Sequence, residues 1–199
     1  MNFIFDIGNV LVEFMPEDYL KRFYNDLKVV EKMNETIFRS PHWLRMDHGR
    51  LSREDATKIF CEREPEYEAE IRKIMQGVDN MFIPKPETIK YLPGIKESGH
   101  KLYYLSNMQV EIRDYLLENH EYLKLFDGGV FSCDVNYIKP APEIYQILLD
   151  KCKLIADECI FFDDMPENIA AAEKEGIKSI MFTSVDCLSD FLNIQNQAV

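Results

Sequence analysis

Reactive side chains follow four short apolar runs of this 199-residue chain. They are a carboxylate, a hydroxyl with an amide, an ammonium and a pair of carboxylates: Asp6, Ser106 with Asn107, Lys139, and Asp163 with Asp164. Carboxylate oxygens are the ligands that Mg²⁺ prefers, and hydroxyl, amide and ammonium groups stabilise anionic oxygens. Side chains of these types predict a site for a hard cation and a phosphate group.

Asp6 is the expected nucleophile of such a site. A carboxylate can attack phosphorus and form an aspartyl-phosphate, which replaces one difficult displacement by two easier ones. Because the attack brings two anions together, a cation must neutralise charge. Asp6, Asp163 and Asp164 can hold one Mg²⁺, which would polarise the phosphoryl group and orient it for in-line attack.

The other three side chains are expected to bind the phosphoryl group. Lys139 would offset the remaining negative charge as a point charge. Ser106 Oγ and the Asn107 amide would bind the non-bridging phosphate oxygens as preorganised donors. Asp6 and Lys139 are therefore the expected catalytic residues, and Ser106 and Asn107 the expected phosphate-binding ones.

The apolar runs indicate the strands of a parallel sheet. Five runs are continuous rather than alternating, which is typical of strands covered on both faces; they span residues 3–5, 102–105, 130–131, 160–162 and 180–182. Helical spacing is found between the later runs, at residues 109–125, 142–154 and 166–175. Alternating strands and helices predict an α/β fold with a doubly wound, Rossmann-like parallel sheet. Ligands of such sheets bind beyond the carboxyl ends of the strands, where the reactive side chains would meet.

The segment after the first strand has a different pattern. Residues 14–85 lack strand-like runs and show charged helical patterns at 18–27 and 53–61, the second preceded by Ser52 as the expected N-cap. We interpret this segment as a helical insertion that folds over the reactive edge of the sheet.

The expected organisation is therefore two domains. A Rossmann-like core comprises residues 1–13 and 86–199, and an all-helical cap comprises residues 14–85. Within the core, Pro93 and Gly94 stand where a helix should precede the second strand, so this helix is expected to be kinked or split.

The charge of the chain bears on its partners. Its 23 basic and 35 acidic residues give a formal net charge of -12, which disfavours binding to nucleic acid or to an anionic membrane surface. A small phosphorylated metabolite remains the expected partner, since one metal ion can invert the sign of a local field. Five cysteines without a C-x-x-C pair and the lack of a long apolar segment are typical of a cytoplasmic protein.

Four stretches of the chain resemble the motifs of a known family. Phe-Ile-Phe-Asp-Ile-Gly-Asn-Val-Leu at 3–11, Tyr-Tyr-Leu-Ser-Asn at 103–107, Tyr-Ile-Lys-Pro at 137–140 and Phe-Phe-Asp-Asp-Met-Pro-Glu-Asn-Ile at 161–169 are similar to the four motifs of the haloacid dehalogenase-like (HAD) superfamily. The resemblance covers the whole chain, with a helical cap inserted after motif I. The D-x-G-N-V form of motif I looks most like that of the glucose-1-phosphatase-like sugar-phosphate phosphatases.

The resemblance implies a role for each motif residue. It assigns Asp6 as the nucleophile, Ser106 and Asn107 as phosphate-binding residues and Lys139 as the lysine of motif III. It implies Asp164 as a magnesium ligand. The backbone carbonyl of Gly8 would be a further ligand, and Asp163 either another ligand or an acid that lies behind the ligands.

One position departs from the family pattern. Phosphatases of the family usually carry a second aspartate two residues after the nucleophile, which protonates the leaving group and later activates water. Here that residue is Gly8, and loss of a positioned acid typically costs about 10²–10⁴-fold in rate. We expect a cap residue, Asp47 or His48, or a metal-bound water to take over this role.

Three functions remain open from the sequence. The first is a Mg²⁺-dependent phosphatase acting on a small phosphomonoester, with a sugar phosphate favoured. The second is a phosphate-binding HAD protein with little or no turnover, because the usual acid is missing. The third is a dehalogenase, which needs no metal and is therefore disfavoured by the acid pair at 163–164.

Overall fold

The computed structural model describes the backbone of residues 1–197 and the side chains of residues 1–194. Five parallel strands form one sheet in the order β3-β2-β1-β4-β5. Their bounds are Asn2–Phe5 for β1, Lys101–Ser106 for β2, Gly128–Phe131 for β3, Cys159–Asp163 for β4 and Lys178–Met181 for β5. The predicted α/β fold with a doubly wound parallel sheet is confirmed, and each predicted strand is present.

The register of the strands aligns their carboxyl ends. Phe5, the last residue of β1, pairs with Tyr104 of β2 on one side and with Phe162 of β4 on the other. The residues that follow, Asp6 after β1 and Asp163 at the end of β4, therefore lie at the same edge of the sheet.

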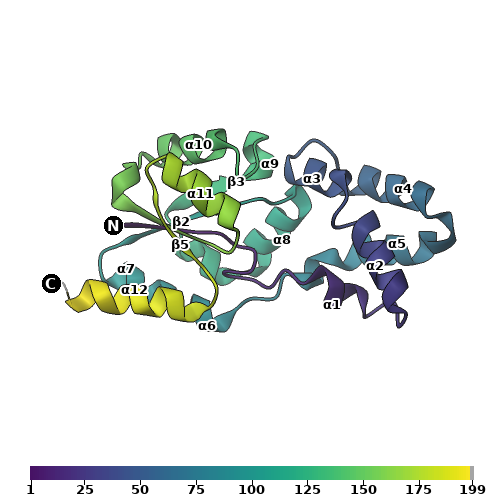
Figure 1. Cartoon of the computed structure of the whole chain (residues 1–199), viewed down its shortest axis with the longest axis horizontal. Coiled ribbons are helices and arrows are strands. Elements are labelled where there is room, and N and C mark those ends of the chain that lie inside the picture. The colour runs from purple at the N-terminus through teal and green to yellow at the C-terminus, as the bar shows by residue number, and fades with distance from the viewer. Residues whose placement is uncertain (198–199) are drawn as a thin grey trace.

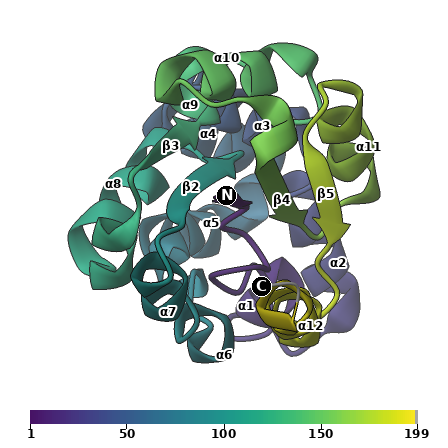
Figure 2. The same cartoon turned by 90° about the vertical axis from the view of Figure 1, so that its left-hand side faces the viewer.

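Helices cover both faces of the sheet, as Figures 1 and 2 show. One face packs against α6 (Pro86–Ile89), α7 (Leu92–Glu97), α8 (Val110–Asn119) and α12 (Val185–Gln197). The other packs against α10 (Pro142–Cys152) and α11 (Pro166–Lys174). Successive residues of a strand point to opposite faces, so Phe3 and Phe5 belong to the first core and Ile4 to the second.

Two predicted helices differ from the structure. The range 109–125 is interrupted at His120, where the backbone is extended, and continues as the 3₁₀ helix η3 (Glu121–Leu125). The range 18–27 was wrong as a single helix: α1 (Pro16–Leu20) ends early and α2 (Leu27–Thr36) begins anew. Asp26 caps α2 by accepting a hydrogen bond from the backbone N–H of Lys28, which ends any continuous helix at this point.

Two local predictions are confirmed. The helix before β2 is split into α6 and α7, with Pro93 in the first turn of α7. Ser52 is the N-cap of α4 (Arg53–Arg63), where its hydroxyl accepts a hydrogen bond from the backbone N–H of Asp55 at 3.1 Å.

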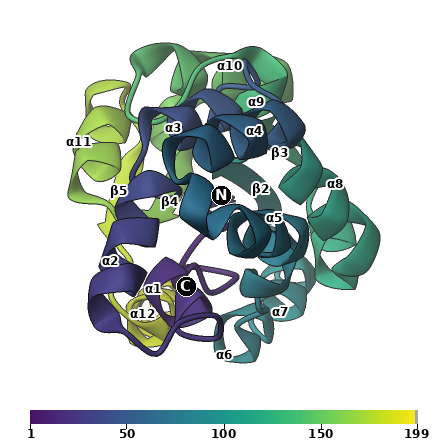
Figure 3. The ribbon, with the colours of Figure 1, turned by 90° about the vertical axis from the view of Figure 1, so that its right-hand side faces the viewer.

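The helices that follow β1 gather at the end of the molecule opposite α7 and α12 (Figure 1). They are α1, α2, α3 (Pro41–Asp47), α4 and α5 (Glu68–Gly77), with the short 3₁₀ helices η1 (Pro65–Tyr67) and η2 (Val78–Met81). In the view of Figure 3, α3, α4 and α5 lie in front of the sheet. We keep residues 14–85 as the proposed cap and residues 1–13 and 86–199 as the proposed core.

Two neighbouring segments connect the helical insertion to the sheet. The backbone N–H of Glu13 donates to the carbonyl of Ile83 at 2.7 Å, and that of Lys85 donates to the carbonyl of Leu11 at 2.8 Å. The entering and leaving chains therefore run side by side, which restricts how the insertion can move relative to the sheet.

A contact between α3 and the short helix α9 (Ser132–Val135) places the end of α3 beside the sheet edge. Ser132 Oγ donates to the backbone carbonyl of Asp47 at 2.5 Å. Gly49 has a positive φ of 68°, and a Cβ there would lie 2.5 Å from the carbonyl oxygen of Cys133. Only glycine allows this approach without strain, so the turn after α3 is fitted to the sheet side.

Nothing within residues 1–197 forms a helix that is both long and apolar enough to cross a membrane.

Candidate active site

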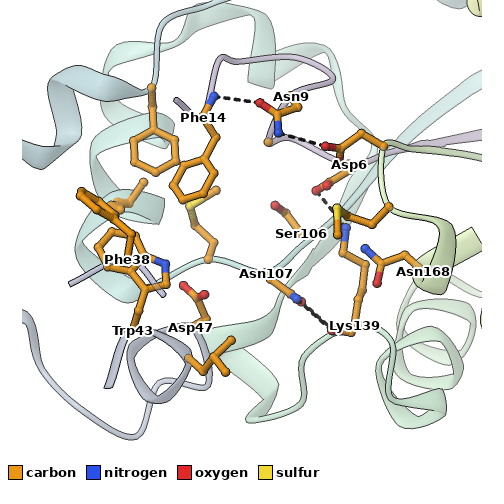
Figure 4. Close-up of a pocket in the computed structure, with 17 residues that line it drawn as sticks. Asp6, Asn9, Phe14, Phe38, Trp43, Asp47, Ser106, Asn107, Lys139 and Asn168 are labelled. Carbon is orange, nitrogen blue, oxygen red and sulfur yellow. Dashed lines mark hydrogen bonds and ion pairs between the residues drawn. The ribbon is translucent and has the colours of Figure 1, made fainter. Parts of the chain in front are cut away.

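A cavity of about 330 Å³ lies at the edge where β1, β2 and β4 end. Most of the reactive residues expected from the sequence line it: Asp6, Gly8, Ser106, Asn107, Lys139, Asp164 and Asp47. Figure 4 shows Asp6, Ser106, Lys139 and Asn168 on one side of this cavity, with Phe38, Trp43 and Asp47 on the other. Asp163 lies behind the cavity and His48 lies outside it.

Lys139 is fully enclosed between two carboxylates. Its Nζ lies 2.9 Å from Asp6 Oδ1 and 2.6 Å from Asp163 Oδ2. Although burial by itself lowers the pKa of Lys139, the charges of Asp6 and Asp163 outweigh this effect and raise the pKa above its usual value. Lys139 is therefore a fixed cation at the base of the cavity.

Asp163 faces the protein interior. Its carboxylate has no exposed surface and accepts hydrogen bonds from the backbone N–H of Met165 and from the side-chain amide of Asn168, in addition to Lys139. These bonds occupy both of its oxygens. Of the two roles left open by the sequence, this geometry favours an acid that lies behind the ligands and positions Lys139.

Asn9 links Asp164 to the start of the helical insertion. Its side-chain amide donates to Asp164 Oδ2 at 2.9 Å, and its side-chain oxygen accepts from the backbone N–H of Phe14 at 3.1 Å. The φ of Asn9 is 55°, a left-handed conformation that asparagine tolerates better than most residues. The sequence analysis missed this residue, and its position within motif I was the one available signal.

The acidic cluster fits a divalent cation. One oxygen from each of Asp6, Asp163 and Asp164 lies within 4.8 Å of the others. Among the side chains of residues 1–194, the ammonium of Lys139 is the one that forms ion pairs with this cluster, so the three carboxylates carry an excess of negative charge. Burial raises the pKa of Asp6 to about 7, partly offset by Lys139, and burial also raises the pKa of Asp164. A hard cation bound by Asp6 and Asp164 would remove this penalty.

Asn107 holds the backbone of Lys139. Its side-chain oxygen accepts from the N–H of Lys139 at 2.7 Å, and its side-chain nitrogen donates to the carbonyl of Lys139 at 3.0 Å. One amide hydrogen remains for a ligand. Ser106, buried at the end of β2, lines the cavity beside Asn107.

Position 8 offers room but no functional group. Gly8 lines the cavity, and a Cβ built there would meet no heavy atom within 4 Å outside its chain neighbours. HAD phosphatases usually carry an aspartate at this position. Here that aspartate is absent, and no other side chain of residues 1–194 fills the space that it would occupy.

Asp47 and His48 differ sharply in position. Asp47 is buried and lines the cavity, and desolvation raises its pKa to about 8, so that its carboxyl group is mostly protonated at neutral pH. His48 caps the end of α3, and its Nδ1 lies 3.2 Å from the backbone carbonyl of Asn136. The structure does not bring the His48 ring into the cavity, because this contact turns it toward the loop after α9.

Comparisons with known proteins identify relatives and a solved structure to which this chain is similar. A sesquiterpene phosphatase of Aspergillus oryzae is 27% identical over 180 residues, which are 90% of this chain and 88% of the relative. A D-ribitol-5-phosphate phosphatase of Bacteroides thetaiotaomicron is 23% identical over 188 residues and 89% of each chain. The solved structure of a HAD family enzyme from Bacteroides thetaiotaomicron, in complex with magnesium and inorganic phosphate, superimposes with a TM-score of 0.73 at 18% identity, covering 90% of this chain and 92% of that one.

The family itself is shown by a match along most of the chain. Residues 1–176 match the sequence profile of the haloacid dehalogenase-like hydrolases. With the parallel sheet and the carboxylate cluster at its edge, this match establishes that the chain belongs to the haloacid dehalogenase-like hydrolase family.

Proposed function

We propose that the protein is a Mg²⁺-dependent phosphatase that hydrolyses a small phosphomonoester through an aspartyl-phosphate on Asp6. The observation that carries this proposal is the position of Asp6 in the cavity, held by Lys139 and adjacent to Asp164. The names of the two relatives of nearly full length, both phosphatases, support it.

Asp6 is oriented so that one oxygen can react. Oδ1 accepts a hydrogen bond from the backbone N–H of Ile7 at 2.7 Å and lies 2.9 Å from Lys139 Nζ. Within the part of the chain that the structure describes, the protein's contacts to this carboxylate involve Oδ1, which leaves Oδ2 for phosphorus. Lys139 would lower the cost of bringing the phosphate dianion beside this carboxylate.

In the first step, Asp6 Oδ2 forms a bond to phosphorus while the bond from phosphorus to the substrate's alcohol oxygen breaks. The departing oxygen takes a proton from the carboxyl group of Asp47, whose raised pKa keeps that proton available at neutral pH. Ser106 and Asn107 donate to the phosphoryl oxygens at the end of β2.

In the second step, water attacks the phosphorus of the aspartyl-phosphate. Asp47, now a carboxylate, takes the proton of the water, and the bond from phosphorus to Asp6 breaks. The products are the free alcohol and inorganic phosphate, and both aspartates return to their starting states.

The expected metal site consists of Asp6, Asp164 and the backbone carbonyl of Gly8. Mg²⁺ bound there would neutralise charge on the phosphoryl group and fix its orientation.

Hydrolysis of p-nitrophenyl phosphate tests this proposal. We expect turnover that is abolished by EDTA, restored by added Mg²⁺, and reduced to background in Asp6→Asn. Asp186→Asn, which changes an exposed acid of α12, is the matched control and should retain activity. Metal-independent turnover, or full activity of Asp6→Asn, would contradict the proposal.

The empty position at Gly8 favours a second candidate, a phosphate-binding HAD protein with little turnover. Its distinguishing result is tight binding of inorganic phosphate without hydrolysis of any phosphoester. Dehalogenation needs no metal ion, so the carboxylate cluster, which fits a cation, does not favour a dehalogenase. Release of halide from a 2-haloacid without metal would support a dehalogenase instead of a phosphatase.

The substrate's alcohol is a finer part of the proposal. The motif I resemblance and the name of the relative that acts on D-ribitol 5-phosphate support a sugar or polyol phosphate. The name of the sesquiterpene phosphatase points to an apolar alcohol instead. The lining of the cavity bears directly on this choice.

A further inference from the structure

The cavity has two chemically different sides. The polar side is formed at the ends of the strands, by Asp6, Asn9, Ser106, Asn107, Lys139, Asp164 and Asn168. The opposite side is mainly apolar, formed by Phe14, Phe38, Trp43, Leu44, Phe82, Met108 and Ile112. A phosphate bound at the polar side would direct the rest of its ester toward this apolar wall (Figure 4).

Four aromatic rings make the apolar wall continuous. Phe38 packs on Trp43 with ring centroids 4.7 Å apart, and Phe14 lies 6.2 Å from Trp43 and 5.6 Å from Phe82. Phe38, Trp43 and Phe82 are each buried. These rings come from four separate places in the insertion, so the wall is a product of the fold and not of one apolar helix face.

Asp47 is the one charged residue that the segment 14–85 contributes to the described lining. Burial raises the pKa of this carboxyl group to about 8, so it is largely neutral at pH 7. In the proposed mechanism it donates its proton to the departing alcohol oxygen. A polyol would bring several further hydroxyl groups against the aromatic rings, where they would lose their hydrogen bonds to water without replacement. An apolar alcohol would instead gain from leaving water.

We propose that the substrate is a phosphomonoester of an apolar alcohol or phenol, with the hydrocarbon part against Phe14, Phe38, Trp43 and Phe82. This inference rests on the proposed phosphatase function and specifies the substrate class of the same site. It predicts selection against hydroxylated leaving groups of equal chain length.

A second cavity of about 350 Å³ adjoins the first on the side of the apolar wall. Phe14 and Phe38 line both cavities, so these two rings form the partition between them. Substrates that fit the first cavity should be preferred over longer ones, and a smaller side chain at position 38 should open a passage into the second.

Three phosphate esters of primary alcohols separate the hydroxyl effect from leaving-group chemistry. Hexyl phosphate and glucose 6-phosphate both release a primary alcohol, and D-ribitol 5-phosphate does the same with an open chain. We expect kcat/KM for hexyl phosphate to exceed that for either polyol ester by about tenfold or more, which corresponds to about 1.4 kcal/mol. Equal or greater kcat/KM for either polyol ester would overturn the inference while leaving the phosphatase proposal intact.

Binding gives a readout that does not depend on turnover. Trp43 is the single tryptophan of the chain and lies in the wall, so its fluorescence reports on occupation. With Asp6→Asn and Mg²⁺, hexyl phosphate should shift this emission and bind at least about tenfold more tightly than D-ribitol 5-phosphate. Selective binding without hydrolysis by the wild-type protein would contradict the proposed function alone, and unselective binding would contradict the apolar class.

A smaller side chain at position 38 tests whether the ring of Phe38 separates the two cavities. Phe38→Leu should raise the ratio of kcat/KM for decyl phosphate over hexyl phosphate several-fold. Phe126→Leu, which shortens a half-buried ring packed on Phe5 away from the cavity, is the control and should leave the ratio unchanged. An unchanged ratio in folded Phe38→Leu protein would overturn the partition.

Discussion

The side-chain amide of Asn9 donates a hydrogen bond to Asp164 Oδ2 across 2.9 Å, although the two residues are 155 positions apart. The same side chain accepts from the backbone N–H of Phe14, and the backbone carbonyl of Asn9 accepts from Lys85 Nζ at 2.8 Å. Asn9 thus connects an acid of the expected metal site to both chains that lead into the insertion. We assign it as a positioning residue, because its side-chain amide holds Asp164 Oδ2 and its side-chain oxygen holds the backbone of Phe14.

Removal of the Asn9 side chain should weaken metal binding. Asn9→Gly keeps the left-handed backbone without strain, and loss of a hydrogen-bond partner behind a metal ligand typically lowers metal affinity about 10–100-fold. We expect the Mg²⁺ concentration for half-maximal activity to rise by this factor, with a smaller change in kcat at saturating Mg²⁺. Asn119→Gly, at the exposed end of α8, is the control. An unchanged Mg²⁺ titration would contradict the assigned role.

The assignment of Asp47 as the acid predicts a dependence on both pH and leaving group. Its protonated form is the active one in the first step, so the rate with a poor leaving group should fall as pH rises through about 8. Asp47→Asn should lower kcat for an alkyl phosphate by about 10²–10⁴-fold and abolish this pH dependence. Hydrolysis of p-nitrophenyl phosphate, whose leaving group needs no proton, should change far less. Equal losses with both substrates would argue against an acid role.

The open space at Gly8 predicts a rescue. Because a Cβ at this position would meet nothing within 4 Å, Gly8→Asp should be accommodated and should place a carboxyl group in the cavity. In the Asp47→Asn background, this change should recover at least about tenfold of the lost activity on an alkyl phosphate, a fraction of what a positioned acid contributes. Gly8→Asn, which has the same size without the acid, should recover none. Equal recovery by both variants would show that the effect is not acid catalysis.

The same burial of Asp47 predicts a stability effect of known sign. The folded protein holds the Asp47 proton up to about pH 8, whereas the unfolded chain releases it near 3.8. The folded state binds more protons between these values, so this group's contribution to stability is full below 3.8 and is lost as pH rises to about 8. Asp47→Asn should therefore gain stability over the wild type by up to about 1.4 kcal/mol per pH unit across this window.

Urea unfolding at pH 5, 7 and 9 measures this effect. The difference in unfolding free energy between Asp47→Asn and the wild type should grow from pH 5 to pH 7 and change little beyond about pH 8. The exposed-site change Asp186→Asn is the control and should give a flat difference. A flat difference for Asp47→Asn would mean that the carboxyl group is ionised in the folded state.

The sheet could be predicted from the sequence because each strand is marked by a short continuous stretch of apolar residues. The apolar runs of β1 and β4 are followed directly by an aspartate, so Asp6 and Asp163 could be placed at one edge before the structure was known. The extent of α1 was not predictable in this way. Residues 21–26 contain neither proline nor glycine, and the helical spacing continues through Phe23 and Tyr24 although the helix ends at Leu20.

The details of the site depend on contacts between distant residues. Asn107 holds the backbone of Lys139, 32 positions away, and His48 is turned from the cavity by the carbonyl of Asn136, 88 positions away. Neither contact has a local sequence signal. The apolar wall is equally non-local, because Phe14 and Phe82 meet only once the insertion has folded.

Acid-quenched single-turnover hydrolysis in H₂¹⁸O tests the nucleophile most directly, through the phosphoryl adduct that the quench traps. With enzyme in excess over a phosphomonoester and Mg²⁺ present, water attacks phosphorus in the second step, so ¹⁸O should appear in the released phosphate and not in the Asp6 carboxylate. Acid quenching before that step should leave the peptide containing Asp6 heavier by one phosphoryl group, and this adduct should be absent in Asp6→Asn. Release of phosphate without any such adduct at early times, or an adduct on another residue, would contradict the account.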